Sequence, residues 1–581
     1  MSDDKNYEPL YRVRHSASHI LAQAVLDLFP GTKLAIGPVI DEGFYYDFDC
    51  PQTFQDEDLV KLEKRMQEIV DEKQEFRQSE ISKAEARKFF HDRQEPYKLE
   101  IIEGIPGETV NLVQNGNFTD LCEGGHVQNS SEVKAFKLLS VAGAYWRGNE
   151  NNAMLQRIYG TAFSSAKELE EYLKRREEAL KRDHRKLGKQ LDLFSFHPEA
   201  PGMPFYHPNG KIIYDELVKF WMAEHLKEGY LEVRTPVLMK DDLWHQSGHY
   251  DHYQQNMFFS KKDNDQYAIK PMNCPGHTLI YGNTQRSYRE LPLRLAELGM
   301  VHRHERSGVL HGLFRVNAFT IDDAHIFCKE DQIESEITRC IGLVLRIYRT
   351  FGFEKIRVYL STRPADSMGS EDIWKKAEAA LREALAHNKI DYEVNEGGGA
   401  FYGPKIDFEI TDSIGRSWQC GTIQLDFQMP MRFGLSFVDS DNQQKQPVMV
   451  HRAVFGSIER FYGILVEHYA GAFPLWLAPV QVRLATISDR HIPFAEKLME
   501  QLKQAGLRVD ADFKTEKIGH KVRDAELMKI PYLFVIGDKE METGRVAVRM
   551  RGRKDLGVQD PAAMVEKIKQ EVAQKTNTAI F

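Results

Sequence analysis

The spacing of apolar residues along this chain predicts helices and strands in alternating blocks. The clearest helix spans residues 164–192, where Ser165 and Glu168 have the spacing of a capping box. Its apolar stripe consists of Leu169, Leu173, Leu180, Leu187 and Leu191. A helix with one apolar stripe and charged flanks is suited to connect two domains.

Two further helices are predicted before this connector. RHSASHILAQAVLDLF has helical apolar spacing, so His15 and His19, four residues apart, share one face. Residues 54–73 form the other helix, with Thr53 and Asp56 as the expected capping pair. We therefore expect an α+β unit in this part of the chain.

Strand-like runs dominate the long region after the connector. A helix to about Glu228 precedes a strand-like run around Pro236, and another helix is expected from about Glu330 to Gly352. Four strand-like runs follow: KIRVYLS, DYEVNE, KIDFEITD and RSWQCGTIQLDFQM. Consecutive strands of this kind favour an antiparallel sheet flanked by helices.

The C-terminal part changes to a strand–helix alternation. VQVRLATI, LRVDADF, PYLFVIG and VAVRM are strand-like, and helices are expected at about 491–505, 516–528 and 560–573. This alternation predicts a small α/β domain.

Composition narrows the class of protein. The 581 residues are 42% apolar and 28% charged, as in ordinary globular proteins of about three or four domains. No apolar run reaches the ~18 residues of a membrane span, and MSDDKNYEPLYRVRH has no signal-peptide core. The six cysteines are scattered, which favours a reducing compartment. We expect a cytoplasmic protein without a membrane partner.

Charge bears on nucleic-acid binding. The net charge of −9 excludes a uniformly basic surface, so a nucleic acid must bind to local patches. KRREEALKRDHRKLGK, in the connector helix, is one such patch. It is either a solvated helix face or a contact with an RNA backbone.

One stretch concentrates arginines beside apolar residues. It reads HRHERSGVLHGLFRVNAFTIDDAH, with Arg303 and Glu305 expected on one face of a strand and Arg315 on a second strand. The guanidinium fork binds phosphate or carboxylate groups bidentately. A charged surface hairpin is the alternative interpretation.

Two sets of histidines and cysteines are candidate metal or catalytic clusters. The first joins His15 and His19 to Cys122 and His126, which are four residues apart around two glycines. It suits a hydrolytic or metal site, or else polar residues on a half-exposed helix. The second set is Cys274, His325 and His451. One cysteine and two histidines suit zinc and leave its fourth position open, as catalytic zinc requires.

The chain resembles the threonyl-tRNA synthetases of bacterial type over nearly its whole length. The matching stretches occur in the family's order: RHSASH, GFYYDFD, AGAYWRG, MLQRIYGTA, KRDHRKLGKQLDLF, IKPMNCPGH, DDAHIFC, FGFEKI, GAFYGPKIDF, LAPVQV and GDKE. The resemblance implies a class II synthetase: an antiparallel sheet flanked by helices, with an N-terminal α+β editing domain and a C-terminal α/β anticodon-binding domain.

Four segments follow from this resemblance. They are an editing domain at residues 1–160, a basic linker helix at 161–195, a catalytic domain at 196–476 and an anticodon-binding domain at 477–581. The run around Pro236 matches the family's first signature motif, which implies a homodimer through the catalytic domain.

The resemblance also assigns site residues. ATP and threonine would be bound by Arg303, Glu305, Arg315, Phe319, Asp323, Tyr402, Gln419, Gln424, Ser457 and Arg460. The implied catalytic residues are Arg303, Arg460, His249 and Lys405, with His249 near the terminal ribose of tRNA. The zinc ligands match Cys274, His325 and His451. The editing residues match His15, His19, Lys98, Asp120, Cys122 and His126, and the anticodon contacts match Glu540 and Arg549.

The implied reaction is the attachment of L-threonine to tRNA(Thr) with ATP. Mg²⁺ accompanies ATP, and one zinc ion per subunit selects threonine over valine. Serine keeps the hydroxyl group and lacks only a methyl, so the editing domain would hydrolyse seryl-tRNA(Thr). Two alternatives from other classes are a hydrolase centred on the His15 cluster and an inactive, RNA-binding paralogue.

The chain departs from the family pattern at several points. A small ubiquitin-like domain is expected before the editing domain, and this sequence starts almost at the editing helix. Ile321 stands where the family usually has glutamine, and Arg306 where proline is common. Thr515 and Lys529 replace residues that often read the anticodon, so those contacts are not carried over.

Overall fold

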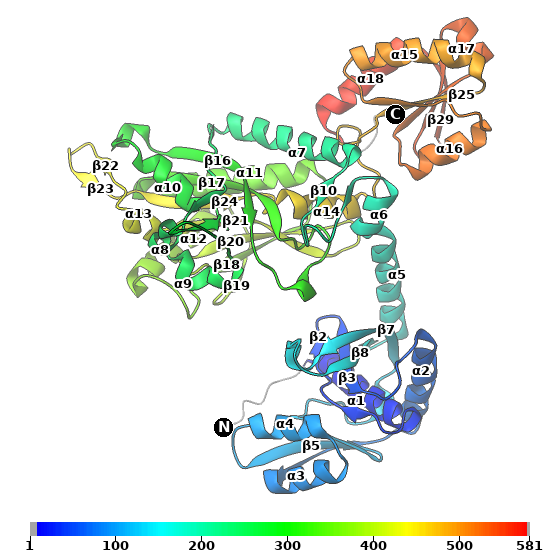
Figure 1. Ribbon diagram of the computed structural model, residues 1–581, viewed down its shortest axis with the longest axis vertical. Helices are drawn as coiled ribbons and strands as arrows, with labels where there is room; N and C mark the ends of the chain where they lie inside the picture. The colour runs from blue at the N-terminus through cyan, green and yellow to red at the C-terminus, as the bar shows by residue number, and fades with distance from the viewer. Residues whose placement is uncertain (1–7, 553, 578–581) are drawn as a thin grey trace. The chain divides into compact units, whose positions relative to one another are not determined.

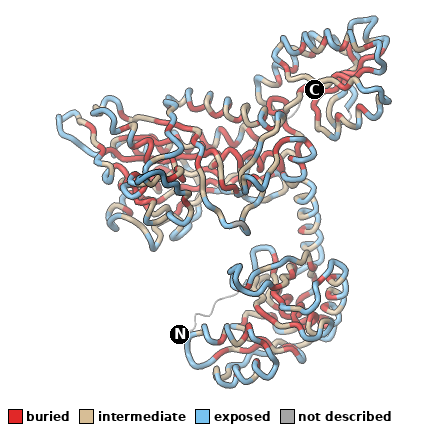
Figure 2. Tube along the Cα trace, in the orientation of Figure 1, coloured by how far each residue is buried: buried red, intermediate tan, exposed pale blue. Residues whose placement is uncertain are grey.

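The computed structural model describes residues 8–552 and 554–577. The chain divides into two compact units, Met1–Glu177 and Glu178–Phe581. Buried residues concentrate in separate cores within these units, as Figure 2 shows in red. Among the described residues, no helix has both the length and the apolar character needed to cross a lipid bilayer.

The first unit is an α+β fold (Figure 1, blue to cyan). Its larger sheet consists of β1 (Lys33–Leu34), β2 (Val39–Ile40), β3 (Gly43–Asp49), β8 (Met154–Phe163) and β7 (Ala135–Tyr145). A smaller sheet consists of β4 (Phe76–Ser82), β5 (Thr109–Asn115) and β6 (Phe118–Leu121). The helices are α1 (Pro9–Leu28), α2 (Asp56–Asp71), α3 (Lys83–Asp92) and α4 (Pro96–Gly104). Apolar faces of α1 and α2 share one core with the larger sheet.

The predicted cap of α2 is wrong. The helix begins at Asp56, and the Gln55 N–H donates to Asp58 Oδ2 at 3.0 Å. The capping carboxylate belongs to the third helical residue, because only that position reaches back to the backbone before the helix. The expected pair of Thr53 and Asp56 lies too early in the chain.

The connector predicted as one helix is two helices. They are α5 (Ala166–Arg182) and α6 (His184–Gln190). Ser165 and Glu168 form the predicted capping box, with N···O distances of 3.1 and 3.3 Å. Asp183 has non-helical backbone angles and accepts a hydrogen bond from the Arg185 N–H at 2.8 Å. A short acidic side chain favours such a cap over continuing a helix, so the break occurs at Asp183.

An eight-stranded sheet forms the centre of the second unit (Figure 1). Its strands, in spatial order, are β11 (Leu231–Glu232), β16 (Leu293–His302), β17 (Ala318–Cys328), β24 (Val448–Ala453), β21 (Ser417–Asp426), β20 (Lys405–Thr411), β18 (Ile356–Ser361) and β19 (Glu393–Asn395). The inner pairs are antiparallel, as predicted, and the outermost pair at each edge is parallel. The apolar core of this sheet includes residues of α7 (Pro208–Lys227), α11 (Ile333–Thr350), α12 (Glu371–His387) and α14 (Ile458–His468).

Two strand predictions in this unit are wrong. Arg303, Glu305 and Arg315 lie in the loop between β16 and β17, outside both strands. Pro236 lies between β11 and β12 (Leu238–Lys240). Proline has no N–H for a ladder, so the strand ends before it. β12 forms a small sheet with β14 (Asp265–Ile269) and β13 (Phe258–Lys262).

Smaller elements cover one end of the eight-stranded sheet. They are α8 (Asp242–Ser247), α9 (His249–Tyr253), α10 (Cys274–Gly282), α13 (Gln428–Arg432), β15 (Arg286–Ser287), β22 (Phe437–Val438) and β23 (Gln444–Lys445). Before the sheet, β9 (Phe194–Ser195) pairs with β10 (Phe205–Tyr206).

The C-terminal segment has its own sheet and core. The strands, in spatial order, are β26 (Val509–Asp512), β25 (Val482–Thr486), β27 (Tyr532–Ile536), β28 (Val546–Met550) and β29 (Lys554–Gln559). The helices are α15 (Ile492–Gln504), α16 (Ile518–Leu527), α17 (Asp538–Thr543) and α18 (Pro561–Gln574). The predicted α/β alternation is present, whereas β29 and α17 escaped prediction because both have few apolar residues.

Candidate active site and editing site

One cavity of about 530 Å³ collects most of the residues predicted to be catalytic, to bind ATP and threonine or to bind zinc. Its walls come from the β16–β17 loop, from β17, β21 and β24, and from the start of α14. The predicted residues that line it are Cys274, Arg303, Glu305, Arg315, Phe319, Asp323, His325, Tyr402, Gln424, His451, Ser457 and Arg460. Residues more than 180 positions apart in sequence therefore share one chamber.

The three candidate zinc ligands lie at one end of this cavity. His325 and His451 are direct partners in the β17–β24 register, and Cys274 begins α10. Partners across an antiparallel pair have adjacent side chains, so the strand register brings the two imidazoles together. The candidate ligand atoms lie within 4.8 Å of one another, and all three residues are buried.

Hydrogen bonds determine which nitrogen each histidine can offer. His451 Nε2 lies 2.9 Å from Asp426 Oδ2, which only accepts, so its Nδ1 remains available. His277 Nε2 lies 3.1 Å from Glu297 Oε2, and His277 Nδ1 lies 2.8 Å from His325 Nδ1. In a neutral His277, the bare Nδ1 accepts from His325, which leaves His325 Nε2 available. Such partners of metal-binding histidines fix their tautomers.

Three arginines also line the cavity. Arg303 Nε donates to the Pro271 carbonyl at 3.2 Å, and its guanidinium lies 5.1 Å from the centre of the Phe319 ring. Arg315 and Glu305 form an ion pair of 2.9 Å. The Ser457 hydroxyl accepts the Arg460 N–H at 3.1 Å and caps α14. A helix N-terminus beside several guanidinium groups is suited to bind polyphosphate.

Asp323, Tyr402 and Gln424 line the same cavity as the candidate zinc ligands. Asn273 donates to Asp323 Oδ2 at 3.0 Å, and burial raises the pKa of Asp323. The Tyr402 hydroxyl donates to Gln424 Oε1. Lys405 forms a 2.9 Å ion pair with Asp407, at the start of β20. Partners therefore hold the side chains of Asp323, Tyr402 and Lys405 in place.

Three predicted residues, Lys405, His249 and Gln419, lie outside the cavity lining. His249 is buried behind Cys274, with 3.8 Å between His249 Nε2 and the thiol sulphur. Burial lowers the pKa of His249 to about 3, so its imidazole is neutral. Gln419 is exposed, at a shift in the register between β20 and β21. Strand spacing therefore does not predict the position of the Gln419 side chain.

The first unit holds the second histidine–cysteine cluster. His15 and His19 project from α1 toward Cys122 and His126, and the candidate ligand atoms lie within 4.8 Å of one another. Cys122 Sγ lies 3.2 Å from His126 Nε2 and 3.5 Å from His15 Nε2. Burial lowers the pKa of His19 and His126, and it raises the pKa of Cys122 to about 12. The imidazoles are neutral bases, and the thiol stays protonated.

A buried ion pair lies beside this cluster. Lys98 Nζ is 2.5 Å from Asp120 Oδ1, and the Tyr46 hydroxyl donates to Asp120 Oδ2 at 2.5 Å. Sequence reasoning missed Tyr46, although it belongs to the GFYYDFD stretch. It likewise missed Asn273 and His277 within IKPMNCPGH, since neither is itself a ligand.

Comparisons with known proteins identify the family of this chain. A model of the tRNA synthetase class II core domain (G, H, P, S and T) matches residues 257–469, an anticodon-binding domain matches 481–571, and a threonyl and alanyl tRNA synthetase second additional domain matches 110–159. A threonine–tRNA ligase of Clostridium botulinum, strain Hall, is 56% identical over 568 residues, covering 98% of this chain and 89% of that protein. The chain belongs to the threonine–tRNA ligase family.

Other relatives support the same family. A threonine–tRNA ligase of Clostridium tetani is 56% identical over 96% of this chain and 88% of its own length. The crystal structure of the RNA binding domain of threonyl-tRNA synthetase from Cryptosporidium parvum is 39% identical, with a TM-score of 0.65 over 67% of this chain and 98% of that chain. Prolyl-tRNA synthetase from Giardia lamblia shares the fold at 16% identity and a TM-score of 0.54, over 69% of this chain and 80% of that chain.

The C-terminal segment holds the two residues that threonine–tRNA ligase resemblance assigns to the anticodon. Glu540, in α17, accepts the Gly537 N–H at 3.0 Å. Arg549 is exposed on β28 and lies 3.8 Å from Asp555. The two side chains occupy different elements, and Arg549 remains accessible to an RNA phosphate or base.

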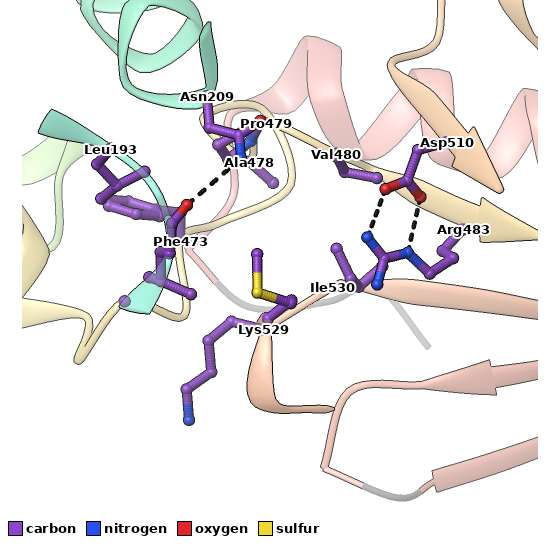
Figure 3. Close-up of a pocket in the computed structure, with 13 residues that line it drawn as sticks. Leu193, Asn209, Phe473, Ala478, Pro479, Val480, Arg483, Asp510, Lys529 and Ile530 are labelled. Atoms are coloured by element: carbon purple, nitrogen blue, oxygen red, sulfur yellow. Dashed lines mark hydrogen bonds and ion pairs between the residues drawn. The ribbon is translucent and has the colours of Figure 1, made fainter. Parts of the chain in front are cut away.

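A separate small cavity, of about 70 Å³, lies beside this segment (Figure 3). Lys529 and Ile530 line it together with Leu193 and Phe473. Its Arg483 guanidinium is paired with Asp510 at 2.8 and 2.5 Å. With this arginine engaged and little volume available, the cavity offers no room for a nucleotide.

Proposed function

We propose that this member of the threonine–tRNA ligase family activates L-threonine with ATP and transfers it to tRNA(Thr). The observation that carries the proposal is the single cavity that joins a Cys–His–His cluster to three arginines. The proposed domains are editing at residues 1–160, a linker at 161–195, catalysis at 196–476 and anticodon binding at 477–581. We assign the protein to the cytoplasm, consistent with six free cysteines.

The Cys274, His325 and His451 cluster fits zinc. One thiolate and two imidazoles are zinc's preferred donors, and the hydrogen bonds of Asp426 and His277 leave one free nitrogen on each ring. When bound, zinc supplies open coordination positions for the amino and hydroxyl groups of threonine. Asp323 lines the same cavity, and its carboxylate would accept a hydrogen bond from the threonine hydroxyl.

Valine is rejected because it lacks that hydroxyl. It removes the hydroxyl donor and leaves the buried Asp323 with only the Asn273 hydrogen bond among the described residues. A site built to bind a hydroxyl rejects the analogue lacking it by roughly 10⁴–10⁵. Serine retains the hydroxyl and lacks a methyl group. The loss of one such group lowers kcat/KM by only about 10–200-fold. The cavity therefore needs a second site to remove serine.

ATP occupies the arginine end. Arg303 and Arg315 hold phosphate oxygens, Phe319 stacks on adenine, and Arg460 with the α14 N-terminus faces the α-phosphate. The threonine carboxylate attacks that phosphate, with loss of pyrophosphate. The arginines, with the Mg²⁺ that accompanies ATP, stabilise the charge that develops on the phosphoryl oxygens. Gln424, Tyr402 and Lys405 orient the amino acid, and neutral His249 lies toward the terminal ribose of tRNA.

We propose a homodimer through the catalytic domain. β11 is an edge strand of the large sheet, so its outer side has unpaired backbone groups. Large apolar side chains are exposed on or next to this edge: Leu231, Val237, Leu238 and Met300. A second copy that covers these residues removes apolar surface from water.

The cluster of the first unit is the proposed serine-editing site. Neutral His15 and His19 can accept a proton from water, and the Lys98–Asp120 pair supplies a cation beside the ester carbonyl. Because Cys122 stays protonated, it acts as a hydrogen-bond donor and not as a nucleophile. Water is then the group that attacks seryl-tRNA.

Threonine-dependent ATP–pyrophosphate exchange tests the proposal as a whole. Zinc-replete protein should exchange label with threonine and show much less exchange with valine. No exchange in such protein would favour an inactive RNA-binding paralogue. A hydrolase centred on His15 would likewise show no exchange.

His15→Ala should abolish editing without affecting threonine activation. Loss of a general base typically costs about 10²–10⁴-fold, so hydrolysis of seryl-tRNA(Thr) should fall by at least about 10²-fold. Deacylation of preformed seryl-tRNA measures this effect. His91→Ala removes an exposed histidine of the same unit and should change nothing. Unchanged deacylation in His15→Ala would remove His15 from the site.

Ile321→Gln should alter substrate binding. Ile321 is buried on β17 between Phe319 and Asp323 and lines the cavity. A glutamine there adds a hydrogen-bonding group, so KM for threonine or ATP should fall about two- to tenfold. Ile321→Leu keeps the apolar volume and serves as the control. If Ile321→Gln leaves both KM values and sensitivity to natural inhibitors unchanged, Ile321 does not shape the pocket.

A further inference from the structure

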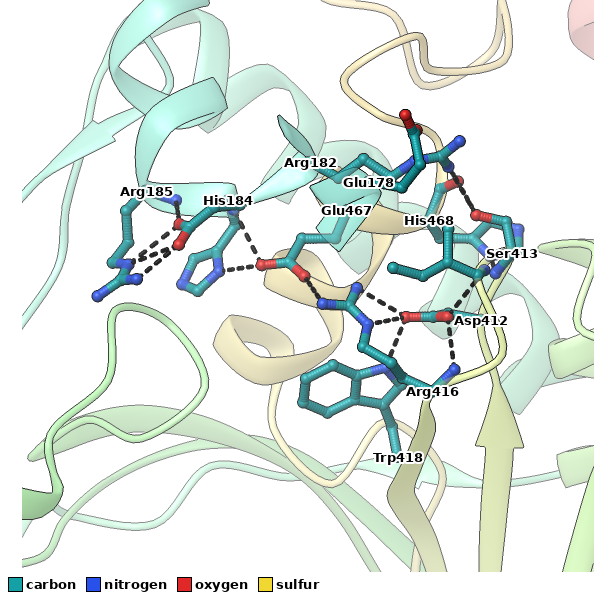
Figure 4. Close-up of polar contacts among 12 residues, drawn as sticks. Glu178, Arg182, His184, Arg185, Asp412, Ser413, Arg416, Trp418, Glu467 and His468 are labelled. Atoms are coloured by element: carbon teal, nitrogen blue, oxygen red, sulfur yellow. Dashed lines mark hydrogen bonds and ion pairs between the residues drawn. The ribbon is translucent and has the colours of Figure 1, made fainter. Parts of the chain in front are cut away.

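A buried histidine of the linker contacts two elements of the catalytic site. His184 begins α6, and both its main-chain N–H and its Nδ1 bond Glu467 Oε1, at 2.9 and 2.6 Å. The Leu313 N–H donates to His184 Nε2 at 2.9 Å. Figure 4 shows His184 facing Glu467 of α14. The imidazole therefore links the β16–β17 loop to α14.

The hydrogen bonds specify one tautomer of His184. A backbone N–H can only donate, so Nε2 accepts from Leu313 and the ring proton is on Nδ1. Nδ1–H then donates to Glu467. The side chain thus uses both ring nitrogens, one toward each element.

The loop is shaped around this ring. The Phe314 ring centre lies 4.1 Å from that of His184. Gly312 has a φ of +49°, and a Cβ on it would lie 2.1 Å from His184 Nε2. Only glycine permits so close an approach. The next residues, Phe314 and Arg315, line the catalytic cavity.

On its other side, Glu467 is held by further charges. Glu467 Oε2 lies 2.6 Å from Arg416 Nη1, and Arg416 pairs with Asp412 at 2.7 Å. Figure 4 shows this chain of contacts. Glu467 belongs to the same helix as Arg460, one of the proposed ATP-binding arginines. His184 therefore contacts both the loop that carries Arg315 and the helix that carries Arg460.

Asp183, His184 and Glu467 also lie close enough together to hold a metal ion. Their donor atoms are already engaged, because Asp183 pairs with Arg185 at 2.5 Å and Glu467 with Arg416. The free lone pair of His184 accepts from Leu313. A metal ion would have to displace all three partners, so we assign this cluster no metal.

We propose that His184 is a positioning residue for ATP, which holds the Gly312–Arg315 segment against α14 and so sets Arg315 relative to Arg460. The inference rests on the proposed ATP site, and wild-type exchange activity tests that site separately. In this proposal, the linker helix lies outside the cavity and still helps to align ATP.

Two substitutions test the two hydrogen bonds of the His184 ring separately. In His184→Asn, the amide reproduces Nδ1 and bonds Glu467 while the Leu313 N–H loses its acceptor. In His184→Gln, the amide oxygen reaches the place of Nε2 and restores that acceptor. ATP–pyrophosphate exchange should show KM for ATP about tenfold higher in His184→Asn and within about threefold of wild type in His184→Gln. KM for threonine should change less than twofold in both.

Lys186→Ala, at an exposed position of the same helix, is the matched control. Rates are normalised to active sites, so that a loss of folded protein does not imitate a change in KM. Equal values of KM for ATP in His184→Asn, His184→Gln and wild type would overturn the proposal. A merely structural role would lower the unfolding temperature and leave KM for ATP unchanged.

Gly312→Ala gives an independent test that keeps the imidazole. The added methyl meets His184 Nε2, so KM for ATP should rise, and His184→Ala should relieve part of this rise in the double variant. Hydrogen exchange of the peptide containing Leu313 should accelerate in Gly312→Ala and in His184→Asn. A contrary result has two parts: the fold-changes in KM for ATP of the two single variants multiply to that of the double variant within about twofold, and hydrogen exchange at Leu313 is unchanged. That result would show that Gly312 and His184 act independently.

Discussion

Cys274→Ala protein is expected to contain no zinc and to lose about 10⁴-fold in kcat/KM for threonine. Cys274 provides the only thiol of the candidate metal cluster, and two neutral imidazoles alone bind zinc weakly. Without the metal, the threonine hydroxyl loses its main binding partner, so discrimination against valine should fall with activity. Metal analysis of purified protein and exchange assays with both amino acids measure these effects.

Cys328→Ala is the matched control for this substitution. Cys328 is also a buried thiol, and it lies on β17 three residues after His325. Its removal should lower stability slightly and leave zinc content unchanged. Stoichiometric zinc in the Cys274→Ala protein would show that the ligand set is wrong.

Arg460→Ala is expected to reduce the rate of threonyl-adenylate formation by about 10²–10³-fold. Arg460 lies in the first turn of α14 and lines the cavity. Charge builds on the α-phosphate only in the transition state, so kcat should fall more than KM for ATP rises. Arg460→Lys keeps one charge without the planar fork, and an intermediate rate is expected.

Arg349→Ala controls for the loss of a positive charge. Arg349 is exposed near the end of α11 and is absent from the cavity lining. Single-turnover formation of threonyl-adenylate should be within about twofold of wild type in this variant. If Arg460→Ala behaves in the same way, the ATP subsite must be assigned elsewhere in the cavity.

In the proposed function, the two histidine–cysteine clusters address different parts of one specificity problem. The proposed role of the cavity in the second unit is to detect a hydroxyl group, which valine lacks and serine has. The cluster of the first unit combines neutral imidazoles with a protonated thiol, which suits hydrolysis by water. Their chemistry differs although their residue types are similar, because their surroundings differ in charge and in hydrogen-bond partners.

Local spacing was sufficient for much of the fold. Helices α1, α2, α7 and α11, the inner antiparallel strands and the C-terminal alternation follow from apolar periodicity. The errors occur where a single polar residue or proline decides a boundary: Asp183 divides the connector, Asp58 caps α2, and Pro236 lies beyond its strand. Periodicity averages over a window, so it does not resolve the effect of one cap or one missing N–H.

The sequence by itself determined that His15 and His19 share a helix face, because their spacing matches one turn. Resemblance to the family supplied the sets of site residues. Only the tertiary structure decided that His325 faces His451. It likewise decided that Asp426 and His277 leave one ring nitrogen available on His451 and on His325, respectively. It also decided that Gln419 lies outside the cavity lining and that His184 meets Leu313 and Glu467. These contacts join residues far apart in the chain, and their register depends on how whole strands and loops pack, which no local pattern encodes.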